Sequence, residues 1–346
     1  MKHQTTRYGE IPFYKIGTFG NTADAFISKK LFLEYKTKYS FPKKGDILIS
    51  ASGTIGRAVI YDGKPAYFQD SNIVWIDNDE TLVKNDFLFY AYSHVKWNTE
   101  HTTILRLYND NFRNTLIPLP PLNEQSAIAD ILSGLDRYLH ALDSLILKKE
   151  SVKKALSFEL LSQRKRLKGF HQAWQKVRLG DIANYLTSNL STEQITQQGK
   201  IKVYDVNNFI GYTDTTFISD KPYISIVKDG SVGRVRILPP KTNILSTMGA
   251  LIANHRTTTE FLFYLLSNFD FKNFTSGSII PHIYFKDYKE KTIFLPPLNE
   301  QIAIANILST LDKEIASLKN KKRQFENIKK ALNHDLMSAK IRVLEK

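Results

Sequence analysis

Two stretches of the chain carry apolar residues at alternating spacings of four and three, between residues 128 and 146 and between residues 304 and 336. This spacing places one apolar stripe along a helix and predicts a coiled-coil seam. Lys149 and Lys322 interrupt the stripe and predict a shift of register there. The seam positions are Ile128, Leu132, Leu135, Leu139, Leu142 and Ile146 in the first helix, and Ile304, Leu308, Leu311, Ile315, Leu318, Phe325, Leu332 and Leu336 in the second.

Each stretch opens with the same seven residues, Leu-Pro-Pro-Leu-Asn-Glu-Gln, at 119–125 and again at 295–301. Proline ends a strand ladder, so the motif predicts the start of a helix. Asn123 and Asn299 are expected to be the N-caps, and the glutamates after them favour the positive end of the helix dipole. Glu124, Gln125, Glu300 and Gln301 complete the two motifs.

Each helix is expected to extend over about 40 residues, or roughly 60 Å. Two helices with matching seams favour an antiparallel pair that holds the flanking parts at a fixed distance. The alternative is two ordinary core helices within compact domains. Basic residues on and beyond the second seam, Lys319, Lys321, Lys322 and Arg323, are expected to form a solvated face.

The repeat extends beyond the motif at an offset of 176 residues, as in Lys153-Lys154-Ala155-Leu156 and Lys329-Lys330-Ala331-Leu332. Weaker matches precede it, including Gly53–Arg57 with Gly230–Arg234. A period this long is too large for a solenoid and predicts two whole domains related by a pseudo-two-fold repeat.

The parts before each motif alternate apolar and polar residues over short runs, separated by Gly, Asn and Asp. This pattern predicts two β-rich globular domains, with helices expected at Asn85–Asn98 and Thr258–Asn268. The fold class predicted is therefore α+β, with two β-rich domains separated by two long antiparallel coiled-coil helices.

The charge balance favours an anionic partner. The chain has 48 Lys and Arg against 34 Asp and Glu, a net charge of +14, and a pI near 9.5. Nucleic acid, an anionic membrane, an acidic protein and a merely solvated basic surface all fit. The chain has no cysteine, which excludes disulfides and thiol catalysis. With no signal-peptide pattern at the first residues and no long apolar run, we expect a soluble cytoplasmic protein.

Gly53–Arg57 and Gly230–Arg234 are predicted to be hairpin turns that each present an arginine, the side chain best suited to forked contacts with guanine or phosphate. The alternative is a surface turn with an unengaged arginine. A second matched pair of segments is Arg106-Leu107-Tyr108 and His282-Ile283-Tyr284. The first residue differs between the two while the apolar residue and the tyrosine persist, as expected of a common frame that presents different recognition groups. An ordinary core or exposed histidine is the alternative for His282. The DNA-contact candidates are Lys43, Lys44, Thr54, Arg57, Arg106, Tyr108, Lys228, Arg234, Arg236, His255, Arg256, His282 and Tyr284.

The duplicated motif, opening a long helix behind two divergent globular parts, resembles the specificity subunit of type I restriction–modification systems. The segment Trp174 to Ile182 is also similar to the family's usual domain opening. The resemblance covers nearly the whole chain. It implies target recognition domains at residues 1–118 and 169–294, and spacer helices at 119–168 and 295–346.

The resemblance further implies that each domain reads one half of a bipartite double-stranded DNA site. The repeated helices would bind two modification subunits, which carry S-adenosylmethionine and methylate adenine, and restriction subunits can join. This chain is expected to bind no cofactor or metal. Gly9-Glu10-Ile11 aligns with Gly199-Lys200-Ile201, so the first domain is expected to lack a counterpart of about Trp174 to Gln198.

Three other functions compete with a DNA-reading subunit. A fused methyltransferase–nuclease is disfavoured, because the sequence has no Asn-Pro-Pro-Tyr-like motif, no glycine-rich cofactor loop and no convincing carboxylate cluster. A coiled-coil scaffold for proteins and an inactive or recombination-donor allele remain as alternatives. Salt-dependent, sequence-selective DNA binding distinguishes the first hypothesis from the scaffold.

Overall fold

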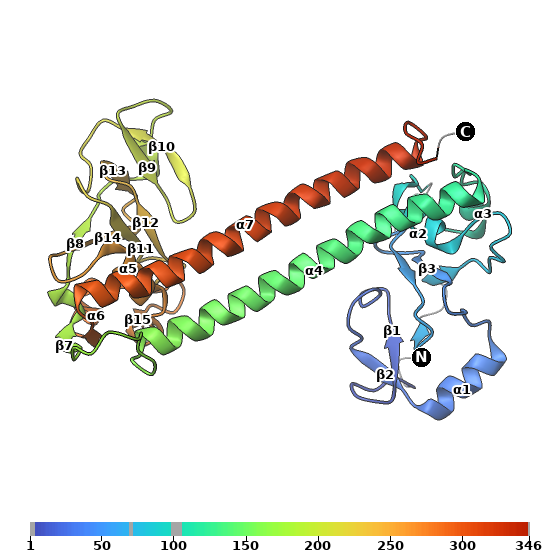
Figure 1. Cartoon of the computed structure of the whole chain (residues 1–346), viewed down its shortest axis with the longest axis horizontal. Helices are drawn as coiled ribbons and strands as arrows, with labels where there is room; N and C mark the ends of the chain where they lie inside the picture. Colours follow the sequence, from blue (N-terminus) through green and yellow to red (C-terminus); the bar gives the residue numbers. More distant parts are fainter. Residues whose placement is uncertain (1–3, 69–71, 98–105, 345–346) are drawn as a thin grey trace. The chain divides into compact units, whose positions relative to one another are not determined.

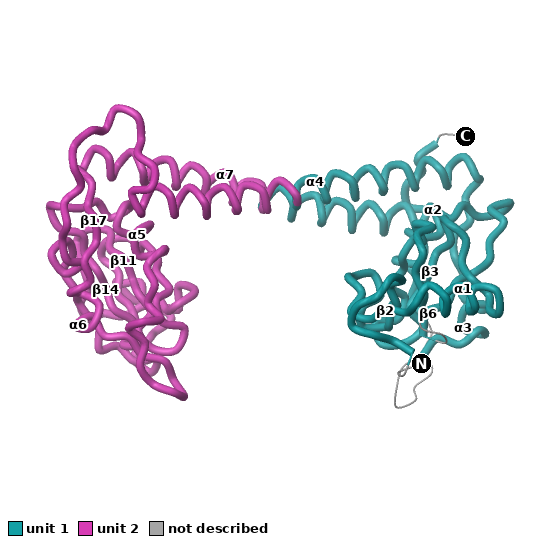
Figure 2. Tube along the Cα trace, turned by 90° about the horizontal axis from the view of Figure 1, so that it is seen from below, with its two compact units in different colours: residues 1–143, 320–346 teal, residues 144–319 magenta. Residues whose placement is uncertain are grey.

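The computed structural model describes residues 4–68, 72–97 and 106–344. The chain forms two compact units: unit 1 comprises residues 1–143 and 320–346, and unit 2 comprises residues 144–319 (Figure 2). The division falls inside both long helices, so each unit contains a segment of each. The predicted domain boundaries at residues 118, 168 and 294 therefore stay a prediction.

The two predicted long helices are present as α4 (Leu122–Leu161) and α7 (Leu298–Met337), each 40 residues long (Figure 1). Their predicted N-caps are wrong. The Gln125 N–H donates to the carbonyl of Pro121 at 2.9 Å, so the second motif proline, not Asn123, accepts the first helical hydrogen bond. Asn123 instead lies in the first turn, and its Oδ1 accepts from the next backbone N–H at 3.0 Å. The same correction applies to Asn299, because Gln301 N–H donates to Pro297 O at 3.0 Å.

Within unit 2, sheets and short helices pack against the segments of α4 and α7. The largest sheet has the order β12-β11-β14-β8, and smaller sheets have the orders β10-β9-β13, β17-β7 and β15-β16. The strands are β7 (Gln175–Arg178), β8 (Ala183–Thr187), β9 (Ile201–Tyr204), β10 (Phe209–Thr213), β11 (Tyr223–Val227), β12 (Val235–Leu238), β13 (Thr242–Ile244), β14 (Met248–Ala253), β15 (Thr275–Ser276), β16 (His282–Ile283) and β17 (Thr292–Leu295). The helices are η2 (Leu179–Asp181), η3 (Thr192–Gln194), α5 (Thr259–Ser267), η4 (Lys272–Phe274) and α6 (Phe285–Tyr288).

The core of unit 2 joins the large sheet, α5 and the long helices. All five residues of β11 are buried, as expected of a strand covered on both faces. Phe261 and Leu262 of α5 and Leu308 of α7 are fully buried in the same cluster as Leu160 of α4. Because apolar side chains of the sheet, α5 and the long helices are buried together, the hydrophobic effect holds the sheet against the long helices.

Unit 1 repeats this plan with fewer strands. Its two sheets have the orders β2-β1-β5 and β4-β3-β6. The elements are β1 (Ile11–Tyr14), β2 (Ala25–Ile27), α1 (Lys29–Lys38), β3 (Ile47–Ser50), β4 (Ala58–Ile60), β5 (Tyr67–Phe68), β6 (Ile73–Trp75), α2 (Asn85–His94) and α3 (Asn109–Arg113). The predicted helix from residue 85 ends at His94, and Asn98 lies outside the described residues. The predicted α+β fold class is confirmed.

In each unit the segments of α4 and α7 pair in antiparallel directions. In unit 1, Asp143 contacts Lys322 and Asp136 contacts Lys329, so the numbers run in opposite directions. In unit 2, Lys149 contacts Glu314 at 2.6 Å. The predicted seam positions are buried or half-buried, namely Ile128, Leu132, Leu135, Leu139, Leu142, Ile146, Ile304, Leu308, Leu311, Ile315, Leu318, Phe325, Leu332 and Leu336.

The predicted shift of register at the seam lysines is wrong. The apolar spacing continues past them to Leu160 and Leu336, which are 1% and 5% exposed. Lys149 and Lys322 occupy seam positions, half-buried, because each finds a carboxylate on the opposite helix. Lys319, Lys321 and Arg323 are exposed, as expected of a solvated basic face, and Lys319 also lies 2.6 Å from Glu150. Lys322 is the half-buried member of this group.

Candidate functional site

The motif glutamine ties the start of each long helix to the loop before the neighbouring helix. In unit 1, Gln125 Oε1 accepts from the Lys84 backbone N–H at 2.7 Å, and its Nε2 donates to the Leu82 carbonyl at 2.9 Å. In unit 2, Gln301 Oε1 accepts from the Thr258 N–H at 3.0 Å. Both glutamines are 1% exposed or less. A buried amide that satisfies both its donor and its acceptor fixes the geometry of this junction.

The motif glutamate binds an arginine that follows the other long helix segment of its unit. Glu124 accepts from Arg342 in unit 1, and the guanidinium holds the pKa of this carboxyl below its usual value. Glu300 accepts from Arg166 at 2.6 Å in unit 2 and from Trp174 Nε1 at 2.9 Å. The motif carboxylates are thus engaged within their own units, where they join the start of one long helix to the residues that follow the other.

A tyrosine on α2 in unit 1, and one on α5 in unit 2, each donate a hydrogen bond to an aspartate of a long helix. Tyr90 of α2 donates to Asp136 Oδ2 at 2.8 Å, and Lys329 binds the same carboxylate. Burial first, and the aspartate second, raise the pKa of the tyrosine hydroxyl. The counterparts in unit 2 are Tyr264, Asp312 and Lys153. The β-rich part of each unit is therefore attached to the long helices by the same polar triad.

Both predicted glycine turns are confirmed as hairpins, joining β3 to β4 and β11 to β12. Gly53, Gly56, Gly230 and Gly233 all have φ between 68° and 82°, a conformation that favours glycine. An aromatic ring lies against the second glycine of each turn: a Cβ added at Gly233 would lie 2.6 Å from Phe271, and the ring at the matching glycine of unit 1 is Trp97. These contacts give the turns a rigid base.

The arginines in and beside the turns differ in the contacts that their side chains make within their own unit. Arg57 is exposed and donates from Nη1 to the Phe19 carbonyl at 3.0 Å. Arg234 is exposed and makes no side-chain hydrogen bond or ion pair with any residue that the structure describes. Arg236 lies over the Tyr204 ring at 5.2 Å and is half-buried. Arg234 is therefore the guanidinium most available to a ligand among these three.

In each unit an isolated β-bridge joins the residue before the glycine turn to the first residue of the second matched segment, Arg106–Tyr108 or His282–Tyr284. In unit 1, Ser52 bridges Arg106, and in unit 2, Asp229 bridges His282, both in antiparallel fashion. The backbone bonds match too, because the Leu107 N–H donates to Ala51 at 2.8 Å and the Ile283 N–H donates to Lys228 at 2.9 Å. The structure thus brings the two predicted candidate surfaces of each unit together. We call this arrangement the turn-and-bridge frame; it comprises residues 51–57 and 106–108 in unit 1, and residues 228–234 and 282–284 in unit 2.

The side chains on this shared frame differ between the units. His282 Nδ1 lies 2.6 Å from Asp229 Oδ1, and both side chains are about one-third exposed. In unit 1 the Arg106 guanidinium lies 3.4 Å from Asn72 Oδ1, which also accepts from Ser52 at 2.7 Å. The tyrosines that follow, Tyr108 and Tyr284, are 43% and 49% exposed. The frame therefore presents different donors and acceptors in the two units.

Comparison with known proteins shows which family has this arrangement. The family model for the type I restriction modification DNA specificity domain matches residues 1–149 and again residues 171–327. The chain belongs to the type I restriction–modification DNA specificity family. The resemblance inferred from the repeated motif is thereby confirmed.

Individual relatives agree with this assignment. The MjaVIII specificity subunit of a type I restriction enzyme from Methanocaldococcus jannaschii is 26% identical over 362 residues, covering 92% of this chain and 84% of that protein. A protein of Haemophilus influenzae named as a type I restriction enzyme specificity subunit is 63% identical over 137 residues, which span 39% of this chain and only 36% of that relative. The crystal structure of a type I S subunit from M. genitalium has the same fold, with a TM-score of 0.63, 21% identity and coverage of 97% and 91%.

Of the remaining DNA-contact candidates, Lys43, Lys44, His255 and Arg256 make no side-chain hydrogen bond or ion pair with the turn residues in the described parts of the chain. Lys43 forms an ion pair with Asp77 at 3.1 Å, which raises the lysine pKa. The stem of Lys44 lies along Gly63, and His255 is exposed. Arg256 donates to Gln175 Oε1 at 3.2 Å, close to the start of α7. The exposed Thr54 lies in the unit 1 turn, and half-buried Lys228 precedes the unit 2 turn.

Sequence reasoning missed the polar partners in the frame, which are Ser52, Asn72 and Asp229. The signal was available, because Ser52 precedes Gly53 as Asp229 precedes Gly230. Within residues 4–68, 72–97 and 106–344, no group of three or more His, Asp or Glu side chains is arranged to hold a metal ion. No helix in those ranges combines the length and apolar character that crossing a bilayer requires.

Proposed function

We propose that this chain is the non-catalytic, DNA-reading subunit of a type I restriction–modification complex, and that each unit reads one half of a bipartite site. One observation carries the proposal: the same turn-and-bridge frame occurs in both units but presents Asp229 and His282 in one and Ser52, Asn72 and Arg106 in the other. A common frame with different polar groups is what two domains need to read two different sequences.

The chemistry of these groups suits duplex DNA. The major groove presents a distinct donor and acceptor pattern for each base pair, and imidazole, guanidinium and amide groups match such patterns. Exposed cations such as Arg234 and Arg57 suit phosphates, which position the protein without specifying a base. The net charge of +14 favours attraction of the duplex at low salt.

The antiparallel segments of α4 and α7 support a second part of the proposal, that the long helices set the gap between the half-sites. Cross-helix pairs such as Asp143–Lys322 and Lys149–Glu314 oppose sliding of one helix along the other. We further propose that these helices bind two modification subunits, which supply S-adenosylmethionine and methylate adenine in a cytoplasmic complex. Restriction subunits join the same complex.

The proposal is tested by expressing this chain with a modification subunit and mapping methylated adenines across the genome. The expected result is one motif with two specified parts and a fixed unspecified gap. Binding of the complex to that site should weaken steeply with salt, since each neutralised phosphate releases a counterion. A complex that assembles but methylates without sequence preference, or binds DNA with no salt dependence, would favour the protein scaffold.

A further inference from the structure

Asp229 and His282 lie opposite each other in the turn-and-bridge frame of unit 2, across an isolated antiparallel bridge. Two backbone hydrogen bonds of 2.9 Å join their chain neighbours, one on each side of the bridge. The two residues are therefore a non-hydrogen-bonded pair, the arrangement in which opposite side chains approach closest in an antiparallel ladder. The backbone thus places a carboxylate beside an imidazole.

The carboxylate contacts one particular nitrogen of the ring. Asp229 Oδ1 lies 2.6 Å from His282 Nδ1, and both side chains are half-buried. The other nitrogen, Nε2, makes no hydrogen bond with any residue in the described parts of the chain. An ionised carboxylate accepts hydrogen bonds and donates none, so the contact requires a proton on Nδ1. In the neutral imidazole this leaves Nε2 as an acceptor.

Gly277 leaves the space for this orientation of the ring. A Cβ added at Gly277, where φ is 90°, would lie 3.1 Å from His282 Cδ2, on the edge of the ring opposite Nδ1. A ring turned by 180° would put this carbon against the carboxylate of Asp229 and lose the hydrogen bond. The two edges of the imidazole therefore have different neighbours, and one orientation is preferred.

The groups next to this pair suit a nucleic acid. Tyr284 is about half exposed, and its ring lies at 20° to that of His282 with the centres 6.4 Å apart. The ammonium of Lys286 lies 5.5 Å from the centre of the Tyr284 ring. Lysine and tyrosine side chains commonly contact phosphates and fix the position of a protein on a duplex. A partly exposed imidazole beside them is placed to reach a base edge.

Unit 1 holds the residue at the matching position in a related way. The Arg106 guanidinium lies 3.4 Å from Asn72 Oδ1, and Ser52 donates to the same oxygen at 2.7 Å. Arginine is always protonated, so such a partner can orient it but cannot change which atoms donate. Histidine differs because its two nitrogens can exchange roles. The partner of His282 therefore decides which group the ring offers to a base.

We propose that Asp229 is a positioning residue that fixes the tautomer of His282, so that Nε2 accepts a hydrogen bond from a base amino group in the major groove, N6 of adenine or N4 of cytosine. This inference rests on the proposed DNA-reading function and adds the chemical group that unit 2 recognises. In the major groove, adenine and cytosine present amino donors, whereas O6 of guanine and O4 of thymine are acceptors. An acceptor nitrogen thus disfavours guanine and thymine at the base that it faces.

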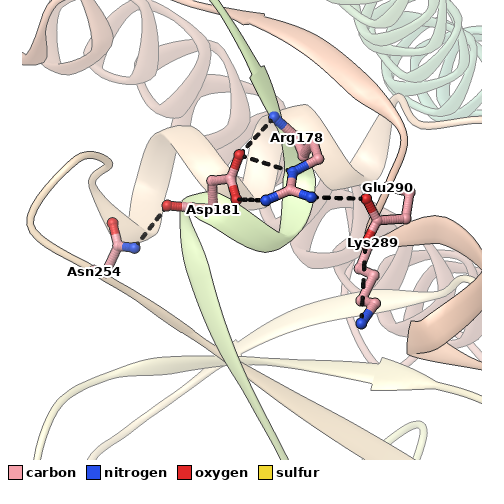
Figure 3. Close-up of polar contacts among 5 residues, drawn as sticks. All are labelled: Arg178, Asp181, Asn254, Lys289 and Glu290. Carbon is pink, nitrogen blue, oxygen red and sulfur yellow. Dashed lines mark hydrogen bonds and ion pairs between the residues drawn. The ribbon is translucent and has the colours of Figure 1, made fainter.

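Another aspartate of unit 2, Asp181, provides the matched control (Figure 3). Its side chain is about one-third exposed, as that of Asp229 is, but its carboxylate binds Arg178 at 2.9 Å. The hydrogen bonds from Arg178 lower the aspartate pKa, and Arg178 also reaches Glu290 at 3.1 Å. Asp181→Asn therefore removes the same charge and a structural contact of unit 2, while the partner of His282 stays in place.

NMR on the full chain with isotopically labelled histidine locates the proton, at about pH 8.5, where a histidine of ordinary pKa is neutral. Comparison with His282→Gln assigns the ring signals of His282. We expect a protonated Nδ1 and an unprotonated Nε2 in the unaltered chain and in Asp181→Asn. Asp229→Asn should give a mixture of both tautomers, because an amide can either accept a hydrogen bond from Nδ1 or donate one to it.

Base preference is measured with the complex of the full chain and a modification subunit, on duplexes that carry single base-pair changes in the mapped site. At one base pair of one half-site, the unaltered complex should favour adenine or cytosine over guanine and thymine by about ten-fold or more. Asp229→Asn should remove most of this preference and leave the other positions unchanged. Asp181→Asn should retain it.

Four results would overturn the proposal. A proton on Nε2 of the unaltered chain, alone or together with one on Nδ1, would make this nitrogen a donor. An Asp229→Asn variant with altered base preference but an unaltered tautomer would make Asp229 a direct contact. Equal weakening at all positions would make the pair a structural contact, and an unchanged preference would give Asp229 no part in reading. An unaltered complex without sequence preference would instead contradict the proposed function, and the NMR spectra would still decide where the proton lies.

Discussion

Arg166 donates two hydrogen bonds to the fully buried carboxylate of Glu300, at 2.6 and 3.2 Å. Removing one partner of such a pair leaves a charge without compensation in the core. Arg166→Ala is therefore expected to lower the free energy of unfolding by about 3 kcal/mol, measured by urea denaturation. Lys165→Ala is the matched control, because the neighbouring lysine is 67% exposed and lies 3.8 Å from Glu159. Equal losses in the two variants would contradict this role for Arg166.

The matching pair in unit 1 predicts a dependence of stability on pH. Arg342 holds the pKa of Glu124 below its usual 4.5. A carboxyl with a lowered folded pKa contributes stability above its unfolded pKa and loses it as pH falls through the folded value. Urea midpoints should therefore fall as pH decreases below about 5. Glu124→Gln should flatten this decrease, and an unchanged slope in the variant would be evidence against the pair.

The glycine turns differ in what a side chain would meet. Gly230 and Gly233 have φ of 82° and 80°, but only Gly233 has a neighbour within 4 Å, the ring of Phe271 at 2.6 Å. Alanine at either position strains the backbone, and at Gly233 it also overpacks the ring. Gly233→Ala is expected to cost about 1–3 kcal/mol more than Gly230→Ala in thermal or urea unfolding. Similar costs would mean that the ring moves freely.

The turn-and-bridge frame predicts residue-specific effects on recognition. His282→Ala should reduce discrimination about ten-fold or more at one or two base pairs of one half-site, since a good base contact contributes about 1–3 kcal/mol. His171→Ala, an exposed histidine that is not among the DNA-contact candidates, is the matched control. Binding to oligonucleotides with single base-pair changes gives the measurement. If His282→Ala weakened all sequences equally, His282 would be a phosphate or structural residue.

Much of the architecture was predictable because it depends on local patterns. The seam spacing identified both long helices, and the glycines of Gly53–Arg57 and Gly230–Arg234 identified both hairpins. The N-cap prediction at Asn123 was wrong because the Pro121 carbonyl serves the first helical bond, a matter of backbone geometry that residue type alone does not decide.

The errors and omissions concern contacts between residues distant in the sequence. Lys149 and Lys322 read as breaks in the seam, but carboxylates on the opposite helix accommodate them. Asp229 was missed because its significance comes from His282, which lies 53 residues further along the chain. The DNA contacts themselves stay a prediction, since the structure shows which side chains share a frame and not which base each would contact.

The central claim is that two separate units each read one half of the site. Its most direct test is to replace residues 171–294 with the corresponding segment of a relative and to map the methylated adenines again. The account predicts that one half of the motif changes while the other half and the gap stay the same. A motif that changes in both halves, or in neither, would contradict it.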